Sequence, residues 1–168
     1  MKKLIALAVA ALSIVPLPAL AGSWKDIEQL ATLVRATGTQ VIKTECNEKA
    51  YGYYQYNKDA GIDRLVICTN VTDMSDPDAV WETLAHESTH VAQACVGSNV
   101  HKDTYMPRVF RALRTEAPHY AELLKGYSED DVQSEAEAFY MELQSPTQVK
   151  RMMVHACNID ADDVAAVS

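Results

Sequence analysis

The 168-residue chain has little glycine or proline, few basic residues and only one long hydrophobic run. Six glycines and six prolines exclude a collagen-like or low-complexity chain. Acidic residues outnumber basic residues by 23 to 15, and the resulting formal charge of −8 disfavours nucleic acids and anionic membrane surfaces as partners. The apolar fraction of 48% is ordinary for a globular protein, and the length suits one domain with one hydrophobic core.

The one long hydrophobic run lies at the N-terminus. A positively charged start precedes the apolar stretch Leu4–Val15, and Ala19–Ala21 then supplies the small residues of a cleavage site. This order is typical of a secretory signal peptide, and the run is shorter than the about 20 residues that span a bilayer. We therefore predict that residues 1–21 are removed. Residues 22–168 should form a single domain that is secreted or periplasmic and has no membrane anchor.

All four cysteines lie in the predicted mature chain. In an oxidising compartment an even number of cysteines predicts disulfide bonds, and four cysteines allow three pairings. We favour Cys46–Cys68, which brackets a predicted hairpin, together with Cys95–Cys157, which would join the end of one helix to the end of the last. No C-x-x-C spacing occurs, and this argues against a metal site built from thiolates.

Hydrophobic periodicity predicts an α+β fold in which one helix and a short antiparallel sheet precede a helical C-terminal part. Helices are expected over residues 24–36, 77–96, 104–115, 118–125, 129–143 and 147–157. Strands are expected near residues 41–42, 51–56 and 65–71, the last two forming a hairpin around a turn at 57–61. The second helix has the clearest limits, because Asp76 can cap its start, Pro77 suits its first turn and Gly97 can end it.

One motif on this second helix carries chemistry, the H-E-x-x-H pattern from His86 to His90. Histidines four residues apart lie on the same face of a helix, so both imidazoles can reach one tetrahedral zinc ion. Glu87 is rotated by about 100° from His86, so it is placed to take a proton from metal-bound water rather than to bind the metal. The alternative is a chance match in which both histidines are simply solvated. The uncharged residues on either side favour the metal site.

Residues 83–92, Thr-Leu-Ala-His-Glu-Ser-Thr-His-Val-Ala, resemble the active-site helix of the zincin metallopeptidases. This resemblance implies a small twisted sheet followed by the active-site helix. It also implies that His86 and His90 bind one catalytic zinc ion and that Glu87 is the general base. The expected reaction is hydrolysis of peptide bonds in a peptide or protein substrate.

The third zinc ligand decides the subclass. Gln93 and Val96 stand where metzincins need glycine and histidine, whereas gluzincins supply a glutamate from a later helix. Glu135 and Glu137 lie about 200° apart on such a helix, so only one of them can face the metal. We favour Glu135, which borders the apolar stripe of its helix, and we expect Glu137 to point more nearly to solvent. The rival third ligands are His101, His119 and His155.

Two further questions stay open in the sequence. A hydrogen-bond donor should steady the oxyanion, and the candidates are Tyr105, His119, Tyr120, Tyr127, Tyr140 and His155. The main alternative to a peptidase is a disulfide-stapled binding or inhibitory module with a structural zinc ion or none. An enzyme with this site could also cut an amide bond of the cell wall.

Peptide mapping of the exported protein tests the cysteine prediction. Without reduction, the digest should contain the Cys46–Cys68 and Cys95–Cys157 peptides and no free thiol, because an oxidising compartment favours both bonds. A peptide joining Cys46 to Cys95 would contradict the pairing.

Overall fold

A computed structural model of the chain describes residues 22–47 and 50–160, so the predicted signal peptide lies outside the described residues. The fold is α+β, as predicted. Its elements are α1 (Trp24–Ala36), β1 (Gln40–Thr44), β2 (Gly52–Asn57), β3 (Ile62–Cys68), α2 (Pro77–Val96), α3 (Met106–Glu116), α4 (Pro118–Leu123), the 3-10 helix η1 (Leu124–Gly126), α5 (Val132–Glu142) and α6 (Pro146–Cys157). None of the helices described is both long enough and apolar enough to cross a membrane.

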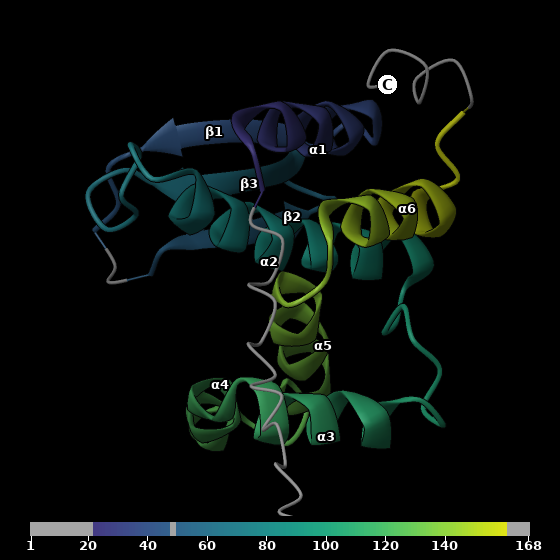
Figure 1. The fold of residues 1–168 in the computed structure, drawn as a ribbon. Coiled ribbons are helices and arrows are strands. Elements are labelled where there is room, and N and C mark those ends of the chain that lie inside the picture. Colours follow the sequence, from purple (N-terminus) through teal and green to yellow (C-terminus); the bar gives the residue numbers. More distant parts are fainter. Residues whose placement is uncertain (1–21, 48–49, 161–168) are drawn as a thin grey trace, which may run out of the picture.

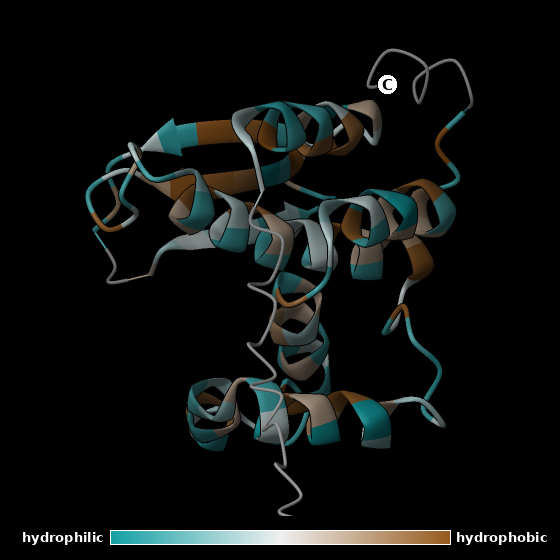
Figure 2. Ribbon diagram, viewed as in Figure 1, coloured by the Kyte–Doolittle hydropathy of each residue, from teal (hydrophilic) through white to brown (hydrophobic). Residues whose placement is uncertain are grey.

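The three strands form a mixed sheet rather than the antiparallel sheet expected from the sequence. The predicted hairpin is present, since β2 pairs antiparallel with β3, but β1 pairs parallel with the other side of β3. The strand order is therefore β1-β3-β2, with the most apolar strand in the centre. Leu65 and Ile67 of β3 belong to the main hydrophobic core. Figure 2 shows hydrophobic residues in the middle of β1 and along β3, and of the three strands β3 is the most buried.

Helices α1 and α2 pack on each other against the sheet, α1 on β1 and α2 on β2 and β3. The limits predicted for α2 are confirmed. The Asp76 side chain accepts a hydrogen bond from the backbone N–H of Asp78, and Pro77 occupies the first turn. Gly97 ends the helix in the left-handed conformation, with φ of 72°, which a glycine adopts without strain. The sequence therefore fixes both ends of the helix that carries the histidine motif.

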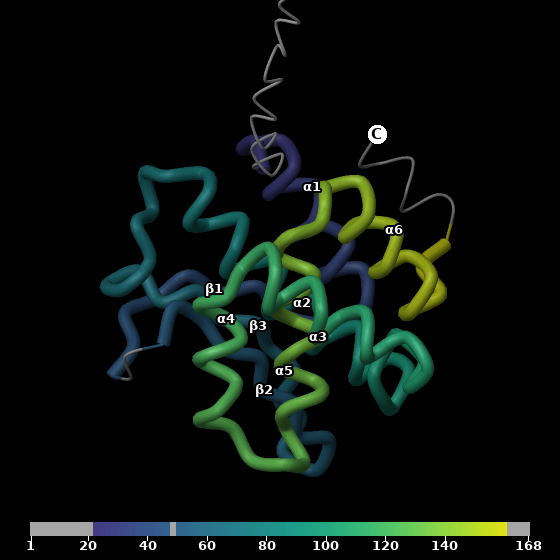
Figure 3. Tube along the Cα trace, turned by 60° about the horizontal axis from the view of Figure 1, so that its bottom comes forward, coloured from purple at the N-terminus to yellow at the C-terminus, as the bar shows by residue number. Residues whose placement is uncertain are grey.

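Helix α5 connects two hydrophobic clusters (Figures 1 and 3). Its C-terminal part contributes Met141 to the main core, which the sheet, α1, α2 and α6 also build. Ala136 and Phe139 of α5 belong to a smaller cluster with residues of α3 and η1. In Figure 1, α5 descends from α2 to the group formed by α3 and α4. Because α5 packs along α2, its side chains can meet those of the histidine motif.

Both predicted disulfide bonds are present, and no described cysteine is free. The Cys46–Cys68 bond joins the chain just after β1 to the end of β3, with a Cα–Cα distance of 5.3 Å. This geometry follows from the parallel pairing, because neighbouring parallel strands end at the same edge of a sheet. Cys95–Cys157 ties the last turn of α2 to the end of α6. The second bond therefore anchors the C-terminal helix to the helix that carries the histidines.

Gly52 allows β2 to approach α2 closely, and its replacement by alanine should destabilise the fold. An added Cβ would lie 2.7 Å from Cγ2 of Thr83, 2.7 Å from the backbone oxygen of Val66 and 3.2 Å from Cγ of Glu87. We expect Gly52→Ala to lower the free energy of unfolding by about 1–3 kcal/mol, the usual cost of overpacking. Gly126→Ala is the control, because its added Cβ meets no atom within 4 Å. Equal urea midpoints for the two variants would contradict this packing.

Candidate metal centre

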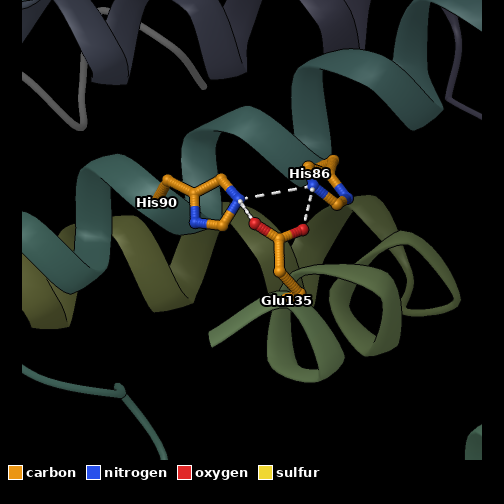
Figure 4. A group of neighbouring side chains, drawn as sticks. All are labelled: His86, His90 and Glu135. Carbon is orange, nitrogen blue, oxygen red and sulfur yellow. Dashed lines mark hydrogen bonds and ion pairs between the residues drawn. The ribbon is translucent and has the colours of Figure 1, made fainter. Parts of the chain in front are cut away.

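His86, His90 and Glu135 lie together where α2 packs against α5 (Figure 4). The two histidines project from neighbouring turns of α2, and their Nε2 atoms are 3.3 Å apart. The Glu135 carboxylate comes from the first turn of α5. Its Oε2 is 3.4 Å from Nε2 of His86, and its Oε1 is 3.4 Å from Nε2 of His90. The structure thus brings together the three residues that the sequence analysis chose as metal ligands.

The spacing of these atoms fits one tetrahedral metal ion. Zinc binds imidazole nitrogen and carboxylate oxygen at about 2.0–2.2 Å, so neighbouring ligands of a tetrahedral site are separated by about 3.3–3.6 Å. The separation of the two Nε2 atoms, 3.3 Å, lies in this range, and each Nε2 lies 3.4 Å from one oxygen of the Glu135 carboxylate, Oε2 for His86 and Oε1 for His90. Two imidazoles and one carboxylate are also ligands that zinc prefers. The donor set and its geometry therefore suit zinc.

Each histidine is oriented through its second ring nitrogen. Nδ1 of His86 lies 2.6 Å from Oε1 of Glu142 at the end of α5. Nδ1 of His90 lies 2.8 Å from Oε1 of Gln93. Both partners present an oxygen acceptor to which Nδ1 can donate its proton, and this arrangement leaves Nε2 as the nitrogen that faces the other members of the group. Such outer partners commonly fix the tautomer and ring orientation of metal-binding histidines.

Glu137 does not point to solvent, and that expectation was wrong. Its side chain is fully buried and accepts hydrogen bonds from four donors. These donors are Nε2 of Gln93 (2.8 Å), the backbone N–H of Val100 (2.9 Å), and both the backbone N–H (2.5 Å) and Nδ1 (2.6 Å) of His101. Burial alone would raise the pKa of Glu137, but these bonds outweigh it and hold the pKa below its usual value. The carboxylate is therefore stable in its ionised form.

Glu137 also determines which atom of the Gln93 amide group faces His90. The Gln93 amide nitrogen donates to Glu137 and to the backbone oxygen of Ser134, at 2.8 and 3.0 Å. The amide oxygen must then face His90. Through this chain of contacts, a carboxylate that binds no metal sets the tautomer of a histidine that can bind one.

Glu87 is buried between α2 and β2. Burial raises the pKa of its carboxyl group to about 7, the charges of Glu135 and Glu142 act in the same direction, and positive charge on His86 opposes them. The carboxylate also accepts a hydrogen bond from the backbone N–H of Tyr54 in β2. Glu87 does not belong to the triangle of His86, His90 and Glu135. This position agrees with the rotation expected from the helix period.

The two histidines respond differently to their surroundings. Burial opposes protonation of His86, but hydrogen bonds with Glu135 and Glu142 raise its pKa to about 10. The pKa of His90 is lowered, chiefly by burial and next by the positive charge of His86. The pKa of Glu135 falls below its usual value because the contacts with both histidines outweigh the effect of burial. These shifts favour a protonated His86, a neutral His90 and an ionised Glu135.

Three aromatic residues, Phe139, Tyr120 and Tyr127, lie close to the triangle or to Glu142 beside it. The ring of Phe139 packs edge-on against His86 and stacks on Tyr120. The Tyr120 hydroxyl donates a hydrogen bond to Oε2 of Glu142, and the Tyr127 hydroxyl is hydrogen-bonded to Glu135. Burial and the Glu135 charge raise the pKa of Tyr127 to about 12. Both phenols therefore stay protonated and can donate at neutral pH.

None of the three rival histidines joins the triangle within the described part of the chain. His101 is bound to Glu137, His119 packs against the Tyr120 ring, and His155 lies on α6. The sequence analysis missed Glu142 and Gln93. Glu142 follows Glu135 by two helical turns and so lies on the same face, while Gln93 lies one turn after His90. Helical spacing could have indicated both residues.

Residues 19–158 match the model of a family described as a domain of unknown function (DUF8637), and the chain belongs to this family. The match includes every residue of the metal triangle and its hydrogen-bonded partners. No curated protein and no solved structure matches the chain. The description of the family names no activity, so the chemistry of the site is the basis for a function.

Replacing Glu137 with glutamine should destabilise the fold and flatten its acid dependence. The new amide group would face at least one N–H donor, and we expect the free energy of unfolding to fall by about 2–4 kcal/mol. The folded-state pKa of Glu137 is lowered from 4.5, so its ionised form stabilises the protein above pH 4.5. That contribution is lost as the pH falls through the folded-state pKa.

Urea unfolding at neutral and acidic pH measures both effects. The exposed Glu129 supplies the control variant, Glu129→Gln, which should match the wild type. A Glu137→Gln variant that matches the wild type at neutral pH would contradict the role of this carboxylate.

Proposed function

We propose that the protein is an exported, zinc-dependent hydrolase that cleaves peptide bonds. The observation that carries this proposal is the triangle of His86, His90 and Glu135, in which the two Nε2 atoms are 3.3 Å apart and each lies 3.4 Å from one oxygen of the carboxylate, a set of donors that zinc prefers. The order of the elements supports it, because a small sheet precedes the histidine helix and a later helix supplies the glutamate, as in the gluzincins that the motif resembles. The disulfide bonds are compatible with an oxidising compartment outside the cytoplasm.

Three protein ligands favour a catalytic metal over a structural one. Structural zinc sites usually have four protein ligands, whereas catalytic sites have three and keep one position for water or substrate. The group found among the described residues has three members. This composition favours the hydrolase over a binding or inhibitory module with structural zinc.

Bound zinc would lower the pKa of a coordinated water to about 7 and polarise a substrate carbonyl. Glu87 would accept the proton of the attacking water on its carboxylate and later donate it to the leaving amine. The hydrogen bond from the Tyr54 backbone and the surrounding packing hold this carboxylate in place. Glu142 and Gln93 would keep both imidazoles in the tautomer that leaves Nε2 free.

The contacts of the six candidate oxyanion donors show which of them lie next to the triangle. Tyr105 and Tyr140 bond to each other and pack against His101, while His155 lies on α6. The Tyr120 hydroxyl donates its hydrogen bond to Glu142, and the His119 ring packs against the Tyr120 ring. Tyr127 is bonded directly to Glu135. We therefore favour Tyr127 as the phenol that donates to the developing charge.

Zinc content and activity of matched variants test the proposal. His86→Ala and Glu135→Gln should lose bound zinc and activity, because each removes a ligand. Glu87→Gln should keep zinc and lose about 10²–10⁴ in rate, the usual contribution of a general base. Glu129→Gln is the control for both measurements. Zinc is measured by elemental analysis, and activity with casein and, separately, with cell-wall peptide fragments.

The outcomes distinguish the alternatives. Negligible zinc in both the wild type and His86→Ala would contradict the metal site. Full activity of Glu87→Gln would contradict the mechanism. Zinc binding by the wild type without cleavage of either substrate would favour the binding-module alternative over a hydrolase of these bonds.

A further inference from the structure

A cavity of about 280 Å³ lies away from the metal triangle, between α5, α6 and the loop that follows α2. Its lining includes His101 of the loop, Tyr140 and Met141 of α5, and Arg151, Met152 and His155 of α6. No member of the metal triangle lines it. The proposed hydrolysis makes no use of this cavity.

The charge of the cavity is unusual for this chain. No aspartate or glutamate lines it, although the sequence contains 23 acidic residues. Among the described residues, the Arg151 guanidinium has no hydrogen-bond or ion-pair partner, whereas the neighbouring Lys150 is paired with Asp26 and Gln29. His155 follows Arg151 by one helical turn on the same face of α6. Within the described part of the chain, this side of the cavity therefore presents one arginine charge, exposed to solvent, that no carboxylate pairs with.

The remaining lining is mixed, because Gln144 and Gln148 contribute amide groups beside apolar and aromatic side chains. Met141 and Met152 are buried, and methionine adapts well to an apolar ligand. The His101 ring stacks on Tyr105 with ring centroids 4.7 Å apart, and its Nδ1 is fixed by Glu137. The hydroxyl oxygens of Tyr105 and Tyr140 are 3.2 Å apart. These contacts order the wall before any ligand enters, and this lowers the entropic cost of binding.

We propose that this cavity binds a small organic carboxylate with an apolar body. Arg151 pairs with the carboxylate, for which the guanidinium offers a fork of N–H donors. The apolar body lies on Met141 and Met152. The size of the cavity suits a ligand of amino-acid size rather than a polymer. This proposal concerns a second site and does not depend on zinc.

N-acetyl-L-leucine is a suitable probe because it has one carboxylate and an apolar side chain. N-acetyl-L-leucinamide is the control ligand, because it has the same shape without the charge. Methyl resonances of ¹³C-labelled methionine report the place of binding. On titration of the full mature protein with the acid, the Met141 and Met152 signals should shift. The Met74 signal should not, because Met74 precedes the 20-residue helix α2 and the cavity lies beyond its other end. The amide should bind about tenfold more weakly, because it lacks the charge-assisted bond.

Two arginine variants distinguish a direct contact between Arg151 and the ligand from a general effect of the protein's charge. Arg151→Gln should weaken binding of the acid by about tenfold and leave that of the amide unchanged. Arg111 on α3 is exposed, as Arg151 is, but it does not line the cavity, so Arg111→Gln should bind as the wild type does. The proposal is overturned by equal affinity for acid and amide, by unchanged affinity in Arg151→Gln, or by no shift of Met141 and Met152.

Discussion

The fold depends on the burial of three carboxylates where α5 meets α2. The exposed fraction of the side chain is 17% for Glu135, 0% for Glu137 and 7% for Glu142. Buried charges are costly unless donors or cations compensate them. Glu137 meets four N–H donors, and Glu142 meets a histidine and a tyrosine. Glu135 alone faces two imidazole Nε2 atoms that can share a metal ion, so the same packing that closes the helix interface creates the candidate site.

The rest of the architecture keeps this interface in register. The caps at Asp76 and Gly97 fix the length of α2, and Gly52 lets β2 approach Thr83 and Glu87. Cys95–Cys157 holds the end of α6 against the end of α2. A short connection joins α5 to α6, so α5 is also kept close to α2. Glu137 ties the loop after α2 to α5. Each of these constraints limits movement of the histidines relative to Glu135.

Local signals in the sequence predicted most of the elements and pointed to His86, His90 and Glu135, which the structure places together. Cap residues and periodicity gave α2, the hairpin and both disulfide pairs, and the apolar stripe of its helix gave Glu135. The parallel pairing of β1 was missed because strand direction depends on long-range contacts. Glu137 was misplaced because its donors, Gln93 and the loop residues Val100 and His101, lie more than 30 positions earlier in the chain. Without those donors, a glutamate opposite the apolar stripe is expected in solvent.

X-ray absorption at the zinc edge tests the central claim, that two histidines and one glutamate hold a zinc ion. The mature protein, purified without chelators from zinc-supplemented culture, is the sample. We expect one zinc per chain with nitrogen and oxygen ligands at about 2.0–2.2 Å, and scattering from two imidazoles. His90→Ala should remove one imidazole contribution. Absence of zinc, or a sulfur shell at about 2.3 Å, would contradict the account.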